Sequence, residues 1–358
     1  MCYVCLIHPR TGGAFRNDSD LTRGCVVVTD TVPADGSRDV SDELQRLIDE
    51  NPNRTLWFPD GKYVLGKPLL TPAHPERSVS LRLSEYAVIQ AADGWNSDEA
   101  LIRLGASHSA NDIRTNGSNY SLTGGIIDGR GVAGGISIDG GRETVVRNVS
   151  IKHARIGLHI KTGANNRSSD ADIYGVNIIG SGTPDSIGVL LEGFDNTLSN
   201  MRIADVQHGV VLRSCGNMLR SIHPLYTCGY EDYENSCGFW DLGGNNWYDF
   251  CYSDHFGVGF RNAPGVSSIY HNCFCMWYAP KGGSHTVFRA DGRFNSFVTN
   301  LKIGFHPEFS ENIILSEAKP GGPGAFENLF VSARRIAGSD HEAHLRGLFH
   351  SLEDLRED

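Results

Sequence analysis

Acidic, imidazole and aromatic side chains that suit sugar chemistry gather between residues 223 and 285. The candidates for acid, base and charge-stabilising roles are Asp232, Glu234, Asp254, His255, Lys281, His285 and His223. The aromatic residues among them are Tyr230, Tyr233, Trp247, Trp277 and Tyr278. Rings that stack on a sugar, with two carboxylates beside them, form the arrangement that glycoside hydrolysis requires, because one carboxyl group protonates the leaving oxygen while the other activates water or attacks carbon.

Asp254, paired with Asp232 or Glu234, is the predicted catalytic pair, and His255 stands beside it. The five aromatic residues, together with Lys281 and the two remaining histidines, are predicted to bind the substrate. Two plainer interpretations stay open. The stretch around Asp232 is as polar as solvent-exposed loops usually are, and the aromatic rings could pack against one another.

A different chemistry would use a base in place of the carboxylate pair. His255, His285 or Lys281 could abstract a proton from a uronate, as lyases and epimerases do, if a cation neutralises the uronate carboxylate. Few basic residues stand near the predicted site. That scarcity favours a glycoside hydrolase or a glycosyl-transferring hydrolase over a lyase or epimerase.

A repeated hexad indicates what positions these residues. The pattern is an apolar residue, any residue, a small or amide residue, a second apolar residue, any residue and usually a third apolar one. Eight copies begin at Val146, Ile173, Leu198, Leu219, Trp247, Tyr270, Val298 and Phe326. A period of 20 to 30 residues is typical of a solenoid, in which each unit buries its apolar side by stacking on the next.

Two sets of residues recur with the hexads and are predicted to be scaffold. The third hexad position, where side chains can bond the turn backbone, contains Asn148, Asn200, Ser221, Asp249, Asn272, Asn300 and Asn328. A glycine recurs at Gly135, Gly157, Gly188, Gly209, Gly238 and Gly257. Asp249 is therefore interpreted as structural in spite of its carboxylate.

The connections that follow the hexads differ in length, and this difference locates the site. They are long after the hexads at Leu219, Tyr270 and Val298, and short after the hexad at Trp247. Insertions at one corner of stacked coils rise from the same face, so Asp254 and His255 are predicted to form the floor of a cleft between two walls. Coils about 4.8 Å apart would allow carboxylate separations of about 5 Å or of about 6.5–9.5 Å, the retaining and inverting distances.

The region before the repeat has the pattern of a terminal cap. Ser41 can cap a helix whose apolar face is Leu44, Leu47 and Ile48, and strands follow on either side of a turn at 59–61. Together with Asp35 and the sequence FPDGKY, this segment resembles the N-terminal cap of the pectate-lyase-like right-handed parallel β-helix superfamily. The expected fold is therefore an all-β, right-handed parallel β-helix with a short N-terminal helical cap and a C-terminal amphipathic helix.

The expected boundaries are an irregular lead-in over 1–30, the β-helix domain with its cap over 31–335, and the C-terminal helix over 336–358. The resemblance implies carbohydrate chemistry, and an oligosaccharide or polysaccharide as the partner. A non-enzymatic alternative also stays open, a trimeric glycan-binding module like those of tail fibres. Of the polygalacturonase motifs only His208-Gly209 is present, and Gly209 already belongs to the recurring glycines.

Composition narrows the remaining functions. A formal net charge of −10 and the lack of any Lys/Arg run argue against nucleic acid or an anionic membrane as a partner. Cys2 and Cys5 could form half of a metal site, but no second pair completes it, so neither a metal nor another cofactor is expected. The first ten residues lack the features of a secretory signal, which favours a cytoplasmic protein, and a homotrimer is a possible assembly.

Overall fold

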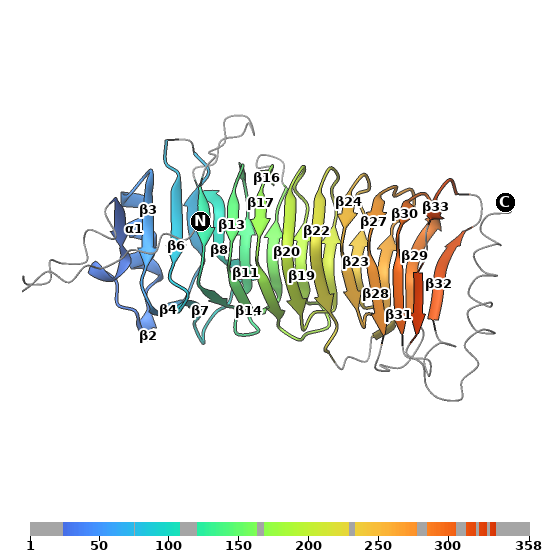
Figure 1. Cartoon of the computed structure of the whole chain (residues 1–358). Coiled ribbons are helices and arrows are strands. Elements are labelled where there is room, and N and C mark those ends of the chain that lie inside the picture. The colour runs from blue at the N-terminus through green and yellow to red at the C-terminus, as the bar shows by residue number, and fades with distance from the viewer. Residues whose placement is uncertain are drawn as a thin grey trace, which may run out of the picture.

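The computed structural model describes residues 24–74, 76–107, 120–162, 168–228, 233–277, 285–305, 313–319, 322–327 and 330–333. Within these residues the chain forms stacked strands and a single α-helix, α1 (Ser41–Glu50). Figure 1 shows the stack as an elongated body, with α1 at one end and β32 at the other. No helix in the described part of the chain is long and apolar enough to cross a membrane.

The strands form three parallel rows, and each coil of the repeat contributes one segment to each row. The first row contains β1 (Cys25–Val27), β3 (Arg54–Phe58), β6 (Val79–Leu83), β9 (Ser121–Thr123), β13 (Val145–Arg147), β17 (Asp172–Tyr174), β24 (Trp247–Asp249), β27 (Ile269–His271), β30 (Phe297–Thr299) and β33 (Ala325–Glu327). The second row contains β2 (Asp35–Asp39), β4 (Gly61–Leu65), β7 (Ala87–Ala91), β10 (Ile126–Asp128), β14 (Ser150–Ala154), β18 (Asn177–Gly180), β25 (Tyr252–Asp254), β28 (Phe274–Trp277), β31 (Lys302–Phe305) and β34 (Phe330–Ala333). β20 (Thr197–Ala204) and β22 (Met218–Leu225) run through both rows and join them into one sheet.

The third row is a separate sheet. It contains β5 (Leu69–Pro72), β8 (Ala100–Ser107), β11 (Gly134–Ile138), β15 (Ile156–Ile160), β19 (Ile187–Leu191), β21 (His208–Leu212), β23 (Cys237–Asp241), β26 (Val258–Asn262), β29 (His285–Arg293) and β32 (Ile313–Lys319). A short pair of strands, β12 (Gly141–Arg142) and β16 (Ser168–Ser169), and two 3-10 turns, η2 (Val28–Asp30) and η3 (Tyr233–Asn235), complete the elements. Apolar residues of all three rows point inward and make one continuous core.

Each hexad spans the corner between the first and the second row. Its third residue makes the turn in the left-handed conformation, with φ of 55° at Asn148, 54° at Asn200 and 56° at Asn300. Asparagine tolerates this conformation better than most residues, because its short polar side chain bonds locally. The backbone conformation of the corner therefore explains the amide residues at this position.

One hexad lies one residue later than the sequence analysis placed it. Tyr248, and not Trp247, pairs with Leu219 and Tyr270 of the neighbouring coils. Phe250 consequently occupies the left-handed corner, with a φ of 52°. Asp249 is not a corner residue. Its side chain faces outward and is within 3.2 Å of His271 Nδ1.

Replacing Phe250 with Asn is expected to stabilise the protein. A left-handed non-glycine residue costs roughly 1–2 kcal/mol, and the cost is smaller for Asn. The ring of Phe250 is 54% exposed, so little buried surface is lost. Chemical denaturation should give a gain in unfolding free energy of up to about 1 kcal/mol. A loss of stability would show that the exposed ring makes a necessary contact.

The recurring glycines lie where the third row approaches the second. A Cβ atom on Gly135 would be 2.6 Å from the side chain of Ile151, and one on Gly209 would be 2.5 Å from Pro224. The last member of this series is Gly259, which faces Cys275, and not Gly257 as predicted. The His208-Gly209 pair is therefore part of the scaffold.

In the coils between residues 196 and 296, a buried polar ladder joins the third-row end of one coil to the first row of the next. The backbone amide of Asn196 donates to Asn217 Oδ1, and that of Asn217 to Asn246 Oδ1, both at 3.0 Å. The amide of Asn246 donates to Ser268 Oγ, and that of Ser268 to Ser296 Oγ, both at 3.1 Å. These residues precede the first apolar residue of their hexads by two positions, and the sequence analysis did not identify them.

The N-terminal helix is present, with Leu44 and Ile48 buried as predicted. Ser41 is the first residue of this helix and not its cap, because the N-cap is Val40, and Asp39 Oδ1 accepts the backbone amide of Ser41 at 2.8 Å. β1 pairs with β3, so the first row begins at Cys25, inside the predicted lead-in. The predicted C-terminal helix over 336–358 lies outside the described residues.

Candidate functional site

Asp254 lies at the end of β25, in the second row between β22 and β28. Its carboxylate accepts hydrogen bonds from His223 Nε2 at 3.2 Å, from the Tyr252 hydroxyl at 3.0 Å and from His255 Nδ1. The side chain of Asp254 is only 8% exposed, whereas that of His223 is 25% exposed. A nearly buried carboxylate is thus held by two imidazoles and a phenol at the outer surface of the stack. This group of four is called the Asp254 cluster below.

The environment of Asp254 fixes its charge. Burial by itself would raise the pKa of this carboxyl group, but the hydrogen bonds from His223 and His255 and, to a smaller extent, from Tyr252 outweigh burial and lower the pKa to about 2. Asp254 is therefore an anion at every pH at which the protein is expected to work. This low pKa argues against Asp254 as the carboxyl group that protonates a leaving oxygen.

Aromatic rings extend from the cluster along the stack. The rings of His223 and Tyr252 stack at a centroid distance of 4.0 Å, and those of Tyr252 and Phe274 at 4.6 Å. Both faces of Tyr252 are thereby covered. Lys302 Nζ lies 5.2 Å from the centroid of Phe274, and Arg202 pairs in register with His223 at the other end. A line of rings with a cation at each end thus runs along the second row.

The outward face of the second row is basic from β14 to β31. From β14 to β31, the cationic side chains with the register of Tyr252 or Asp254 are Lys152, Arg202 and Lys302, and Asp254 is the one acid. In the preceding strands the same registers contain the acids Asp128, Asp39 and Asp35 and the cation Lys62. The expectation that few basic residues stand near the site therefore needs correction, and the objection to a uronate substrate weakens with it.

Of the predicted acids, Glu234 lies in η3 and is exposed. Its backbone packs near Gly257, since a Cβ on Gly257 would be 3.0 Å from the Cα of Glu234. No described hydrogen bond joins Glu234 to the Asp254 cluster. Asp232, Tyr230, Tyr278 and Lys281, and with them much of both predicted walls, lie outside the described residues.

Three residues predicted to bind substrate are core residues instead. Trp277 is fully buried and its Nε1 donates to the carbonyl oxygen of Phe256 at 2.7 Å. Tyr233 and His285 are buried too, and a hydrogen bond of 2.9 Å joins the Tyr233 hydroxyl to His285 Nδ1. Burial, and then the nearby imidazole of His255, lower the pKa of His285 to about 4. Their rings are not available to stack on a sugar, because they are buried. Residue type alone did not distinguish the inward side of the coil from its outward side, so the sequence did not reveal this burial.

Trp247 is exposed, as a sugar-binding ring must be, but it belongs to the first row and not to the second. It lies in one outward line with Met218, Ile269 and Phe297, which are in register on successive coils. These four side chains are 43–50% exposed. They form an apolar stripe around the corner from the Asp254 cluster.

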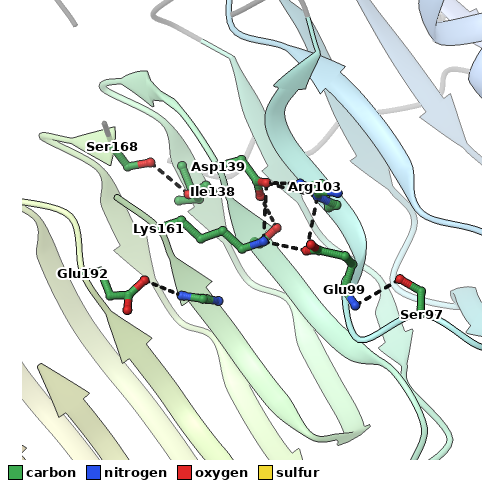
Figure 2. A network of polar contacts seen from close by, with 10 residues as sticks. Ser97, Glu99, Arg103, Ile138, Asp139, Lys161, Ser168 and Glu192 are labelled. Carbon is green, nitrogen blue, oxygen red and sulfur yellow. Dashed lines mark hydrogen bonds and ion pairs between the residues drawn. The ribbon is translucent and has the colours of Figure 1, made fainter. Parts of the chain in front are cut away.

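A second group of polar residues lies over the third row, in coils nearer the N-terminus (Figure 2). Lys161 Nζ is 2.6 Å from Glu99 Oε2 and 3.5 Å from Asp139 Oδ2. His159 Nε2 is 2.9 Å from Glu192 Oε2. None of these residues is among those predicted from the sequence. Across the described parts of the chain, no group of three or more His, Cys, Asp or Glu is arranged to hold a metal ion.

Comparison with known proteins identifies the fold. No protein-family model matches the sequence, and no curated protein matches it significantly. Among solved structures, a tailspike protein of E. coli bacteriophage HK620 has a TM-score of 0.65 at 12% identity, over 92% of this chain and 66% of that one. The A-module of the Azotobacter vinelandii mannuronan C-5 epimerase AlgE6 has a TM-score of 0.50 at 12% identity, over 87% of this chain and 100% of that one.

The fold is a parallel β-helix. The parallel β-helix that the sequence led us to expect is therefore confirmed as the fold. Open reading frame 18 of Geobacillus virus E2 has the same fold, with a TM-score of 0.50, 12% identity and coverage of 88% of this chain. The chain spans 61% and 66% of the lengths of the two viral proteins. At 12% identity, these likenesses concern the β-helix and not its activity.

Proposed function

We propose that this β-helix protein binds a uronate-containing glycan along the second row and abstracts a proton from one uronate, as a lyase or an epimerase does. The observation that carries the proposal is the Asp254 cluster, in which an ionised carboxylate accepts a hydrogen bond from His255. A solved tailspike of this fold is in complex with a pentasaccharide, and the AlgE6 module belongs to a mannuronan epimerase. Both are consistent with a glycan as the partner.

His255 is the proposed base. A carboxylate that accepts the Nδ1 proton of a histidine fixes the tautomer of the ring, so that Nε2 has the lone pair that accepts a proton. The same carboxylate stabilises the imidazolium that forms. Asp254 is suited to this task because its low pKa keeps it charged while His255 changes its protonation state.

The cations along the second row have the complementary task. Removing the proton next to a uronate carboxylate leaves negative charge that spreads onto that carboxylate, and a nearby cation stabilises it. Arg202 and Lys302 lie at the two ends of the ring line that includes Tyr252. The intermediate then either regains a proton on its other face or expels the neighbouring glycosidic oxygen, which distinguishes an epimerase from a lyase.

A glycoside hydrolase fits the cluster less well. Its general acid must be protonated near neutral pH, and the pKa of Asp254 is about 2. The second candidate function is a glycan-binding module without catalysis that assembles as a trimer. The apolar stripe at Met218, Trp247, Ile269 and Phe297 favours it, since an exposed patch of this kind marks an interaction site.

Product analysis in D2O would test the proposal. The protein would be incubated with oligomannuronate, oligoguluronate and oligogalacturonate, and with neutral oligosaccharides as controls, and the products would be analysed by mass spectrometry. Uronate substrates should gain solvent deuterium without cleavage or yield unsaturated fragments. Products that have gained water, or no change in any uronate, would contradict proton abstraction and favour hydrolysis or simple binding respectively.

A further inference from the structure

A pocket opens on the outward face of the third row, remote along the stack from the Asp254 cluster. Its volume is about 420 Å³, within the range of about 300–1,000 Å³ typical of ligand sites. Ala100, Gly134 and Ile156 line its floor at the starts of β8, β11 and β15. Later coils place larger residues here, Ile187 and then His208. The pocket exists because Ala100 and Gly134, on two successive coils, have small or no side chains at the position that Ile187 and His208 fill on later coils.

Charged side chains surround this floor in pairs. On one side Arg155 donates to Asp185 at 2.9 Å and to Asp98 at 3.3 Å. On the other side Lys161 donates to Glu99 at 2.6 Å. Figure 2 shows Lys161 reaching toward Asp139 of the neighbouring coil and Glu99 of the coil before it. The rim therefore offers a ligand both carboxylate acceptors and cationic donors.

A buried layer holds the rim in place. Asp139 is 8% exposed, and its Oδ2 accepts from Arg103 Nη2 at 2.5 Å and from Arg103 Nε at 3.1 Å. The Ser137 hydroxyl donates to the other oxygen of the same carboxylate. Lys161 is thus positioned between Glu99 and a fixed anion. Preorganised polar groups of this kind reduce the entropy lost when a ligand binds.

The balance of charge indicates what the pocket would bind. The lining includes three acids, Asp98, Glu99 and Asp185, against two cations, Arg155 and Lys161. Burial lowers the pKa of His159, although Glu192 opposes the shift, so His159 is largely neutral at pH 7. Because each cation already has a carboxylate partner, an anionic ligand would meet uncompensated acids.

We infer that this third-row pocket binds a neutral saccharide unit. Sugar hydroxyls both donate and accept, so they can bond the carboxylates and the cations of the rim without adding charge. The apolar floor at Ala100 and Ile156 suits the C–H face of a pyranose ring. The pocket is on a different row and on earlier coils than the Asp254 cluster, so the inference does not depend on the proposed function.

Filling the pocket provides the test. Gly134 does not have a left-handed φ, and a Cβ there would be 3.2 Å from the Cα of Ala100, a tight contact that the backbone must relieve by a shift of a few tenths of an ångström. Gly134→Val is therefore expected to fold with reduced stability. Gly94 has open space around it, and Gly94→Val is the matched control. Binding of maltotriose, cellotriose, triacetylchitotriose and, as the anionic counterpart, trigalacturonate would be measured by saturation-transfer NMR.

At least one neutral trisaccharide should bind to the wild-type protein and to Gly94→Val, and its affinity should fall at least tenfold in Gly134→Val. Deuterium exchange into uronates should be unaffected by Gly134→Val, which separates this site from the proposed catalytic one. If Gly134→Val does not fold, Glu99→Gln should weaken the same binding severalfold, since it removes a charged acceptor. Binding of trigalacturonate alone, binding of no neutral sugar, or unchanged affinity in the folded variants would overturn the inference.

Discussion

Replacing His255 with Gln is expected to reduce the turnover of a uronate substrate by about 10²–10⁴-fold, the contribution typical of a general base. The amide preserves approximate size and hydrogen bonding to Asp254 but cannot take up a proton. Substrate affinity should change little, because the loss concerns the transition state. Steady-state rates of deuterium exchange or of unsaturated product formation would measure it, with circular dichroism to establish folding.

Asp254→Asn should give a comparable loss, because an amide can neither fix the His255 tautomer in the same way nor stabilise its charged form. The control is Asp249→Asn. Asp249 is partly exposed on the first row, where it lies beside Arg220 and His271, so its replacement should leave turnover within about twofold of wild type, the size of a typical surface effect. Full activity in the His255 variant, or loss of activity in the Asp249 variant alone, would move the site away from the second row.

Replacing Gly209 with Val is expected to destabilise the fold by about 3 kcal/mol or to prevent soluble expression. A Cβ at this position would clash with the carbonyl oxygen of Gly238 and lie 2.5 Å from Pro224 Cβ. Gly238 cannot move away easily, because Ser253 and Gly259 lie close to it on the next coil. Thermal and chemical denaturation of the purified variant would measure the effect.

Gly94→Val again provides the comparison, and its unfolding free energy should stay within about 0.5 kcal/mol of wild type. The result bears on function as well as stability. If Gly209→Val folded normally but lost activity, the His208-Gly209 pair would have the catalytic role that its place among the stacked glycines argues against.

The hexads and the recurring glycines made the stacked architecture predictable, because both reflect burial and close backbone approach. The register of one coil was not predictable. Trp247 and Tyr248 are adjacent aromatic residues, and either fits the first apolar position. Only the pairing of Tyr248 with Leu219 and Tyr270 decides between them. Asp249 was placed at the corner for this reason.

The candidate site was predictable in part. Asp254 and His255 interrupt the repeat, and this property located them. The burial of Trp277 could not be inferred, since an aromatic residue suits both a core and a sugar platform. The third-row pocket was missed because it results from missing side chains at Ala100 and Gly134. The signal in the sequence is the small size of Ala100 and Gly134 relative to Ile187 and His208 at equivalent positions of the third row.

The ladder of Asn196, Asn217 and Asn246 gives the rod a modular length. Each of these side chains receives the amide of the preceding coil, and each amide donates to the following coil, so every rung is chemically interchangeable with its neighbours. Asn196 and Asn217 are 21 residues apart. Duplication of residues 196–216 would therefore add one coil while leaving no amide or side-chain acceptor of the ladder unmatched. Such a protein can lengthen or shorten in evolution by whole coils, because the hydrogen bonds between coils stay the same.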